Sequence, residues 1–131
     1  MKVIIVKPFT NPFVKEIKGD LESMQAVVGG YIQAIYPFDD EVALVCNEEG
    51  KINGLMPNRY LLNRNNGILD FICGDFFLCY APCDSENFES MPDNLIDKYI
   101  AKFSAKGARI RHILRIAAQP KNSKRNTASS L

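Results

Sequence analysis

The stretch Lys2-Val3-Ile4-Ile5-Val6-Lys7 decides the fold of this 131-residue chain. A short, continuous run of β-branched residues is typical of a central strand that is buried on both faces. Pro8 and Pro12 bracket a turn after it, and residues 13–17 can return as the second strand of a hairpin. The start of the chain therefore predicts a sheet.

Further strands and two helices are expected along the chain. Asp20 can cap the first turn of a short helix, and Gly29-Gly30 is a natural stop for it. Ser90 and Asp93 form a capping-box pattern ahead of a longer helix with one apolar stripe. Additional strands are predicted at residues 31–38, 42–46, 68–73 and 76–80.

The order of these elements indicates an α+β fold. Gly74-Asp75 separates the last two predicted strands and favours a tight hairpin between them. We expect a mostly antiparallel sheet of about five or six strands, with one short and one longer helix packed on one face. Residues 1–105 form this single domain, and residues 106–131 form a basic C-terminal extension that is partly helical or disordered.

The extension is the most basic part of the sequence. Residues 1–105 hold 9 Lys/Arg and 15 Asp/Glu, a net charge of −6, whereas residues 106–131 hold 7 Lys/Arg and no acid, a net charge of +7. Residues 108–118 can form a helix or a strand, with the helix favoured, and a solvated tail is expected from Gln119 onward. Six cations could neutralise phosphates of a nucleic acid: Arg109, Arg111, Arg115, Lys121, Lys124 and Arg125.

Other uses of these cations remain open. Aromatic residues of the kind that stack on bases are not interleaved with them. The same charges could dock on the acidic body of another subunit in a homo-oligomer, or they could form a solvated face.

The polar loop, residues 47–59, carries the densest set of candidate binding residues. Two readings fit its sequence, Asn-Glu-Glu-Gly-Lys-Ile-Asn-Gly-Leu-Met-Pro-Asn-Arg. In the first, it binds a protein or a small anionic ligand such as a phosphate, with Lys51 and Arg59 meeting the anion. In the second, Glu49-Gly50 is a hairpin tip, Asn53-Gly54 is a second turn and Asn58 satisfies local backbone groups. The candidate site residues are Glu48, Glu49, Lys51, Asn53, Asn58 and Arg59.

We expect neither an enzyme nor a cofactor. Neighbouring carboxylates such as Glu48 and Glu49 would point to opposite faces of a strand. A cysteine nucleophile needs a base, and the only histidine, His112, lies in the extension. Cys79 and Cys83 could share a zinc ion, but a structural zinc site needs two more ligands, so no metal is expected.

The composition favours a cytoplasmic protein. No apolar run reaches the roughly 18 residues that a membrane-spanning helix requires. The first residues read as a buried strand rather than a signal peptide. The cysteines are then expected to be reduced.

Several segments within residues 1–105 resemble a family of small bacterial domains of unknown function, DUF3846. The shared segments are Val28-Gly29-Gly30-Tyr31-Ile32, Tyr36-Pro37, Asn47-Glu48-Glu49-Gly50-Lys51, Asn53-Gly54-Leu55, Pro57-Asn58-Arg59 and Gly74-Asp75-Phe76-Phe77. The chain departs from the family at Met56, where a proline is frequent, and the extension is not part of the resemblance. The resemblance implies a phage or plasmid setting, at times as a module of larger anti-restriction polypeptides, in a bacterial host cell. It implies no activity.

Together these observations favour a non-catalytic binding module of a mobile genetic element that uses the polar loop. The alternative is a nucleic-acid-associated protein that binds through residues 106–125.

Overall fold

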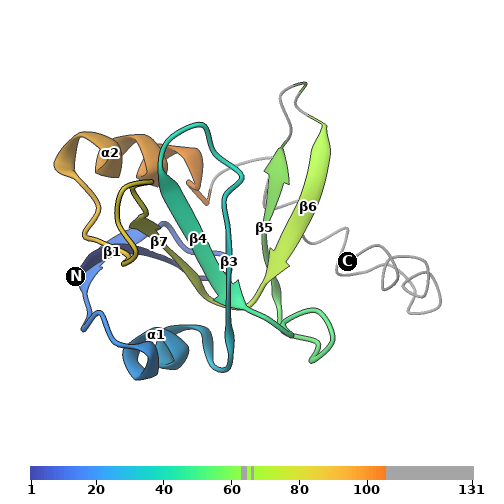
Figure 1. Cartoon of the computed structure of the whole chain (residues 1–131). Helices are drawn as coiled ribbons and strands as arrows, with labels where there is room; N and C mark the ends of the chain where they lie inside the picture. Colours follow the sequence, from blue (N-terminus) through green and yellow to red (C-terminus); the bar gives the residue numbers. More distant parts are fainter. Residues whose placement is uncertain (63–64, 66, 106–131) are drawn as a thin grey trace.

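A computed structural model describes residues 1–62, 65 and 67–105 of the chain (Figure 1). The predicted helix or strand at 108–118, the tail and the six basic candidates for nucleic-acid binding lie outside these residues.

The main sheet has five strands in the order β2-β1-β7-β4-β3, and neighbouring strands are antiparallel. Its strands are β1 (Lys2–Val6), β2 (Phe13–Glu16), β3 (Ile32–Ile35), β4 (Val42–Asn47) and β7 (Phe76–Tyr80). A separate antiparallel ribbon joins β5 (Pro57–Leu62) and β6 (Ile68–Cys73). The helices are α1 (Leu21–Val28) and α2 (Asp93–Lys102). The α+β fold with a mostly antiparallel sheet is confirmed, as is the hairpin of β1 and β2.

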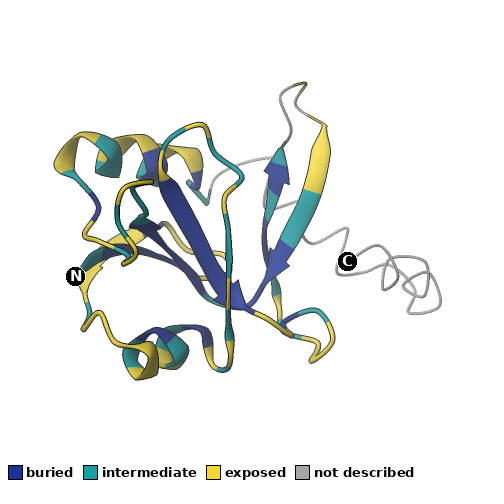
Figure 2. Cartoon of the chain, in the orientation of Figure 1, coloured by how far each residue is buried: buried dark blue, intermediate teal, exposed yellow. Residues whose placement is uncertain are grey.

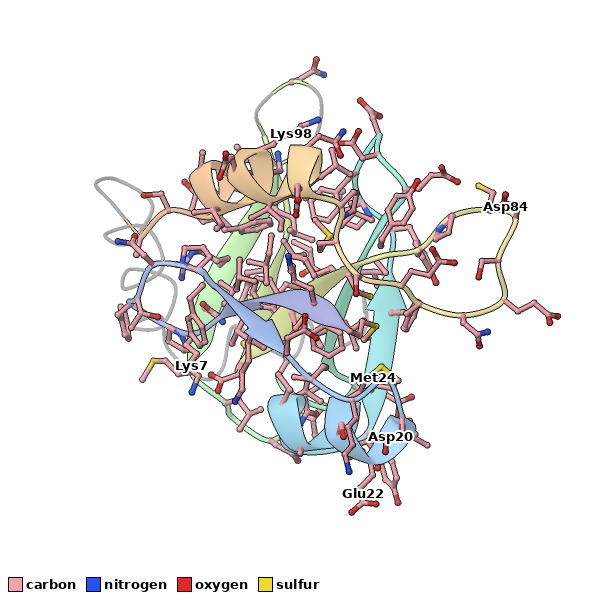
Figure 3. All side chains as sticks on the ribbon, turned by 90° about the vertical axis from the view of Figure 1, so that its left-hand side faces the viewer. Lys7, Asp20, Glu22, Met24, Asp84 and Lys98 are labelled. Atoms are coloured by element: carbon pink, nitrogen blue, oxygen red, sulfur yellow. The ribbon has the colours of Figure 1, made fainter. Side chains whose placement is uncertain are left out.

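The two helices cover opposite faces of the main sheet, so the expectation that both pack on one face is wrong. Met24 and Val28 of α1 pack against Val3, Ile5 and other residues of one face. The opposite face packs against α2 and the β5–β6 ribbon. Figure 3 shows α2 above the sheet and α1 below it, with Met24 between α1 and the sheet and Glu22 pointing away.

The central strands explain this arrangement. β4 is buried along its whole length (Figure 2), and so is β1 from Val3 to Val6. Strand side chains alternate between faces, so a strand that is apolar at every position must be covered on both sides.

Three local predictions also need correction. Gly74-Asp75 does not close a hairpin: β6 pairs with β5, while β7 pairs with β1 and β4, so the chain changes sheets at Gly74 with φ of 85°. Ser90 does not cap α2, because the N-cap of this helix is Pro92. The Ser90 hydroxyl instead accepts a hydrogen bond from the Lys2 amide. The strand expected at 31–38 is limited to β3.

Candidate binding site

The polar loop is shorter than predicted and folds on itself. Its last residues, from Pro57, belong to β5. Before them, the amide of Asn53 donates to the carbonyl of Glu49 at 2.8 Å, and the amide of Leu55 donates to the carbonyl of Gly50 at 2.9 Å. The expected hairpin tip at Glu49-Gly50 is absent because β4 and β5 belong to different sheets. The segment between the two strands is a compact series of turns.

Asn47 fastens this loop to α1. Its side-chain amide donates to the carbonyl of Val28 at 3.1 Å, and its side-chain oxygen accepts from the amide of Glu49 at 2.8 Å. The first bond satisfies a carbonyl at the end of the helix that has no partner within the helix. One buried side chain therefore sets the position of the loop relative to α1.

Lys51 fastens the other side of the loop to β6. Its ammonium lies 2.5 Å from the carboxylate of Asp70 and 4.5 Å from the centre of the Phe71 ring. Gly50 lets the loop backbone lie close to the end of β6, because a Cβ at that position would lie 2.7 Å from the carbonyl oxygen of Cys73. The half-buried Lys51 is thus paired with a carboxylate of its own chain.

Asn58 and Arg59 lie in the interior, each with 1% of its surface exposed. The Asn58 amide donates to the carbonyls of Val6 and Gly74. The guanidinium of Arg59 donates to the carbonyls of Phe103, Lys7 and Thr10 and to the Asn58 side chain. The expectation that Arg59 meets an external anion does not hold, because these bonds turn its guanidinium toward the turn after β1 and the end of α2.

The remaining candidates lie at the surface. Glu48, Glu49 and Asn53 are exposed. Glu49 and Asn53 line a hollow of about 250 Å³ between the C-terminal end of α1 and the loop. The complete lining is Gln25, Gly29, Gly30, Tyr31, Asn47, Glu49 and Asn53.

This hollow is lined by a carboxylate, side-chain amides and a phenol. It offers the carboxylate of Glu49 and the amides of Gln25 and Asn53, whereas the amide of Asn47 is bonded within the chain. The phenol belongs to Tyr31, a residue with 69% of its surface exposed. Such a surface suits a positively charged or donor-rich group, since an arginine can bond to a carboxylate and stack on an aromatic ring.

Gln25 and Tyr31 were not among the predicted site residues. They lie on α1 and just after it. Two contacts bring them to the loop: the side chain of Asn47 joins the end of β4 to the end of α1, and the carbonyl of Tyr31 accepts from the amide of Glu48 at 2.8 Å. The one local signal was an aromatic residue directly after Gly29-Gly30, at a point where the chain must turn.

Cysteines and acidic residues are the other groups among the described residues that could bind a metal ion or act as nucleophiles. Among these residues, no group of three or more His, Cys, Asp or Glu side chains is placed to hold a metal ion. Burial raises the pKa of Cys46 and Cys73 to about 11 and that of Cys79 to about 12. These thiols stay protonated and are poor nucleophiles. Within the same residues, neither helix is long and apolar enough to cross a membrane.

Most of the described part of the chain matches a known family model. A family model described as Domain of unknown function (DUF3846) matches residues 1–104. The chain belongs to this family. No curated protein matches it, and no solved structure does either. The DUF3846 match ends close to Ala105, so it covers the α+β domain and leaves the basic extension outside.

Proposed function

We propose that this DUF3846 protein is a non-catalytic binding module of a mobile genetic element and that it engages a protein partner through the hollow. The observation that carries the proposal is the hollow itself, where acceptor groups from α1, the following turn and the polar loop meet. The mobile-element setting is what the family resemblance implies.

The geometry favours a basic partner over an anionic ligand. The loop contains two cations, Lys51 and Arg59. Lys51 is paired with Asp70, and Arg59 is bonded to buried carbonyls. The carboxylates of Glu48 and Glu49, in contrast, are exposed. A phosphate would therefore meet like charge at this surface, whereas an arginine or lysine side chain would meet opposite charge.

A titration with short charged peptides tests this proposal. A six-arginine peptide added to the full-length chain at low salt should shift the NMR signals of the amides of Tyr31, Glu49 and Asn53. The double substitution Glu48→Gln with Glu49→Gln should weaken binding by about tenfold, because each exposed ion pair contributes up to about 1 kcal/mol.

The matched control removes the same charge elsewhere. Asp84 and Glu86 are exposed on the segment between β7 and α2, and Asp84 lies away from α1 in Figure 3. Asp84→Asn with Glu86→Gln should change the affinity by no more than about twofold. The proposal is wrong if a six-glutamate peptide shifts these amides instead, or if both double variants bind the arginine peptide equally.

A further inference from the structure

The charges of the chain are divided between two segments. The domain body, residues 1–105, has a net charge of −6, and residues 106–131 have a net charge of +7. The last described residues are held in place: the Ala105 amide donates to the Asn11 side chain at 3.0 Å, and the Phe103 carbonyl accepts from Arg59. The basic segment 106–125 therefore starts from a fixed point on an oppositely charged domain.

Two acidic residues elsewhere on the domain, Asp40 and Glu41, are already engaged. The Asp40 carboxylate accepts from Lys98 and Tyr99, and these bonds hold its pKa below the usual value. The Glu41 carboxylate accepts from the amide of Cys83, which lowers the pKa of Glu41 as well. Glu49 differs because it lines a hollow whose amides and exposed Tyr31 can complete the contact with an arginine, and Glu48 is its exposed neighbour in the chain.

The length of the extension allows it to reach this hollow. Arg125 is 20 residues beyond Ala105, and an extended chain spans about 3.3 Å per residue, or roughly 66 Å. A domain of this size has a radius of gyration of about 13 Å, so every part of its surface is within reach.

The covalent link between the extension and the domain favours docking of the chain's own extension over docking of the extension of a second copy. A surface contact of one or two ion pairs contributes only about 1–2 kcal/mol, so further contacts are needed before it holds two separate molecules together. Covalent linkage of two groups through a short stretch of chain raises the effective concentration of one near the other to about the millimolar range. Weak contacts of this kind are therefore populated within one chain before they are populated between chains.

We propose that the basic segment 106–125 docks in the hollow of its own domain, so that an external basic partner must displace it. This inference rests on the proposed function and adds regulation of the same site: the extension is an internal competitor.

Paramagnetic NMR on the full-length chain tests the contact. A spin label is attached at Ser123→Cys in a Cys83→Ser background; the other three cysteines are buried and remain unlabelled. At about 0.05 M salt, the amides of Tyr31, Glu49 and Asn53 should lose at least about half of their signal. The signal should return at about 1 M salt, where charges are screened within a few ångströms.

Variants of the same labelled chain show whether the charges of the hollow are responsible. Glu48→Gln with Glu49→Gln should restore the signal, and Asp84→Asn with Glu86→Gln should not. Broadening that is absent from the hollow, or that survives neutralisation of Glu48 and Glu49, overturns the inference. Broadening that appears only between labelled and unlabelled molecules in a mixed sample also overturns it, because the occupant is then a second copy.

A competition measurement separates this inference from the proposed function. Lys121→Gln, Lys124→Gln and Arg125→Gln together, in the part of the extension that is long enough to reach the hollow, should tighten binding of the six-arginine peptide by at least about threefold. Unchanged affinity, with peptide binding still dependent on Glu48 and Glu49, overturns the competition and leaves the proposed function standing. Loss of that dependence overturns both.

Discussion

At the scale of single residues, Arg59 shows how a side chain that looks like a binding group can hold the fold together. Its guanidinium joins three segments through the carbonyls of Lys7, Thr10 and Phe103. Arg59→Met would leave two buried acceptors, the Phe103 carbonyl and the Asn58 side-chain oxygen, without that donor, at a cost of about 1–3 kcal/mol for each unsatisfied group. We expect the free energy of unfolding, measured by urea denaturation, to fall by at least about 2 kcal/mol.

Lys15→Met is the control for the loss of a positive charge, since Lys15 is exposed on β2. Its effect should stay within about 0.5 kcal/mol, as for most surface substitutions. If Arg59→Met is as stable as Lys15→Met, Arg59 is not a structural residue.

Residue types alone could not separate these roles. Asn58, Arg59, Glu49 and Asn53 are all polar residues of one short stretch, and the sequence grouped them into a single candidate site. The structure divides them because Asn58 and Arg59 lie on β5, which turns them inward, whereas Glu49 and Asn53 precede it. Burial of a charged residue depends on acceptors from distant segments, and no local pattern reports those acceptors.

At the scale of elements, the sequence located most strands but not all of their partners. Apolar runs identify β1, β4 and β7 because each strand carries its own signal. Pairing is different, since Gly74-Asp75 fits a hairpin turn equally well whether or not the flanking strands pair. The same two residues instead carry the chain from the ribbon into the main sheet. The positions of strands are local information, and the sheet order is not.

The change of sheets at Gly74 makes a specific prediction. Gly74 has φ of 85°, and an added Cβ would lie 2.7 Å from a methyl carbon of Leu55 in the polar loop. Gly74→Ala should therefore lower the free energy of unfolding by about 1–3 kcal/mol, because the left-handed conformation and the contact both oppose a side chain.

Gly19→Ala is the matched control. Nothing lies within 4 Å of a Cβ at Gly19, and its backbone is not left-handed. Urea denaturation should place it within about 0.5 kcal/mol of the wild type or slightly above it. Equal stability of the two alanine variants would contradict the role given to Gly74.

At the scale of the whole molecule, burial of three thiols ties stability to alkaline pH. Cys46 and Cys73 have pKa values of about 11 and Cys79 of about 12, against an ordinary value of 9.0, with burial as the main cause. The unfolded chain releases these protons at lower pH than the folded chain. Stability is therefore fully present below pH 9 and declines as the pH rises through the folded pKa values.

Ionisation of each of these thiols in the unfolded chain should lower the free energy of unfolding by on the order of 1–2 kcal/mol between pH 8 and pH 10.5. Cys79→Ala deletes one of them, so its urea midpoint should fall less steeply over this interval than that of the wild type, whatever its stability at pH 7. Cys83→Ala, at an exposed position, should change the slope less. Parallel curves for the wild type and Cys79→Ala would mean that the thiol inside the main sheet titrates alike in the folded and unfolded chains. Burial on both faces of the sheet would then not protect its proton.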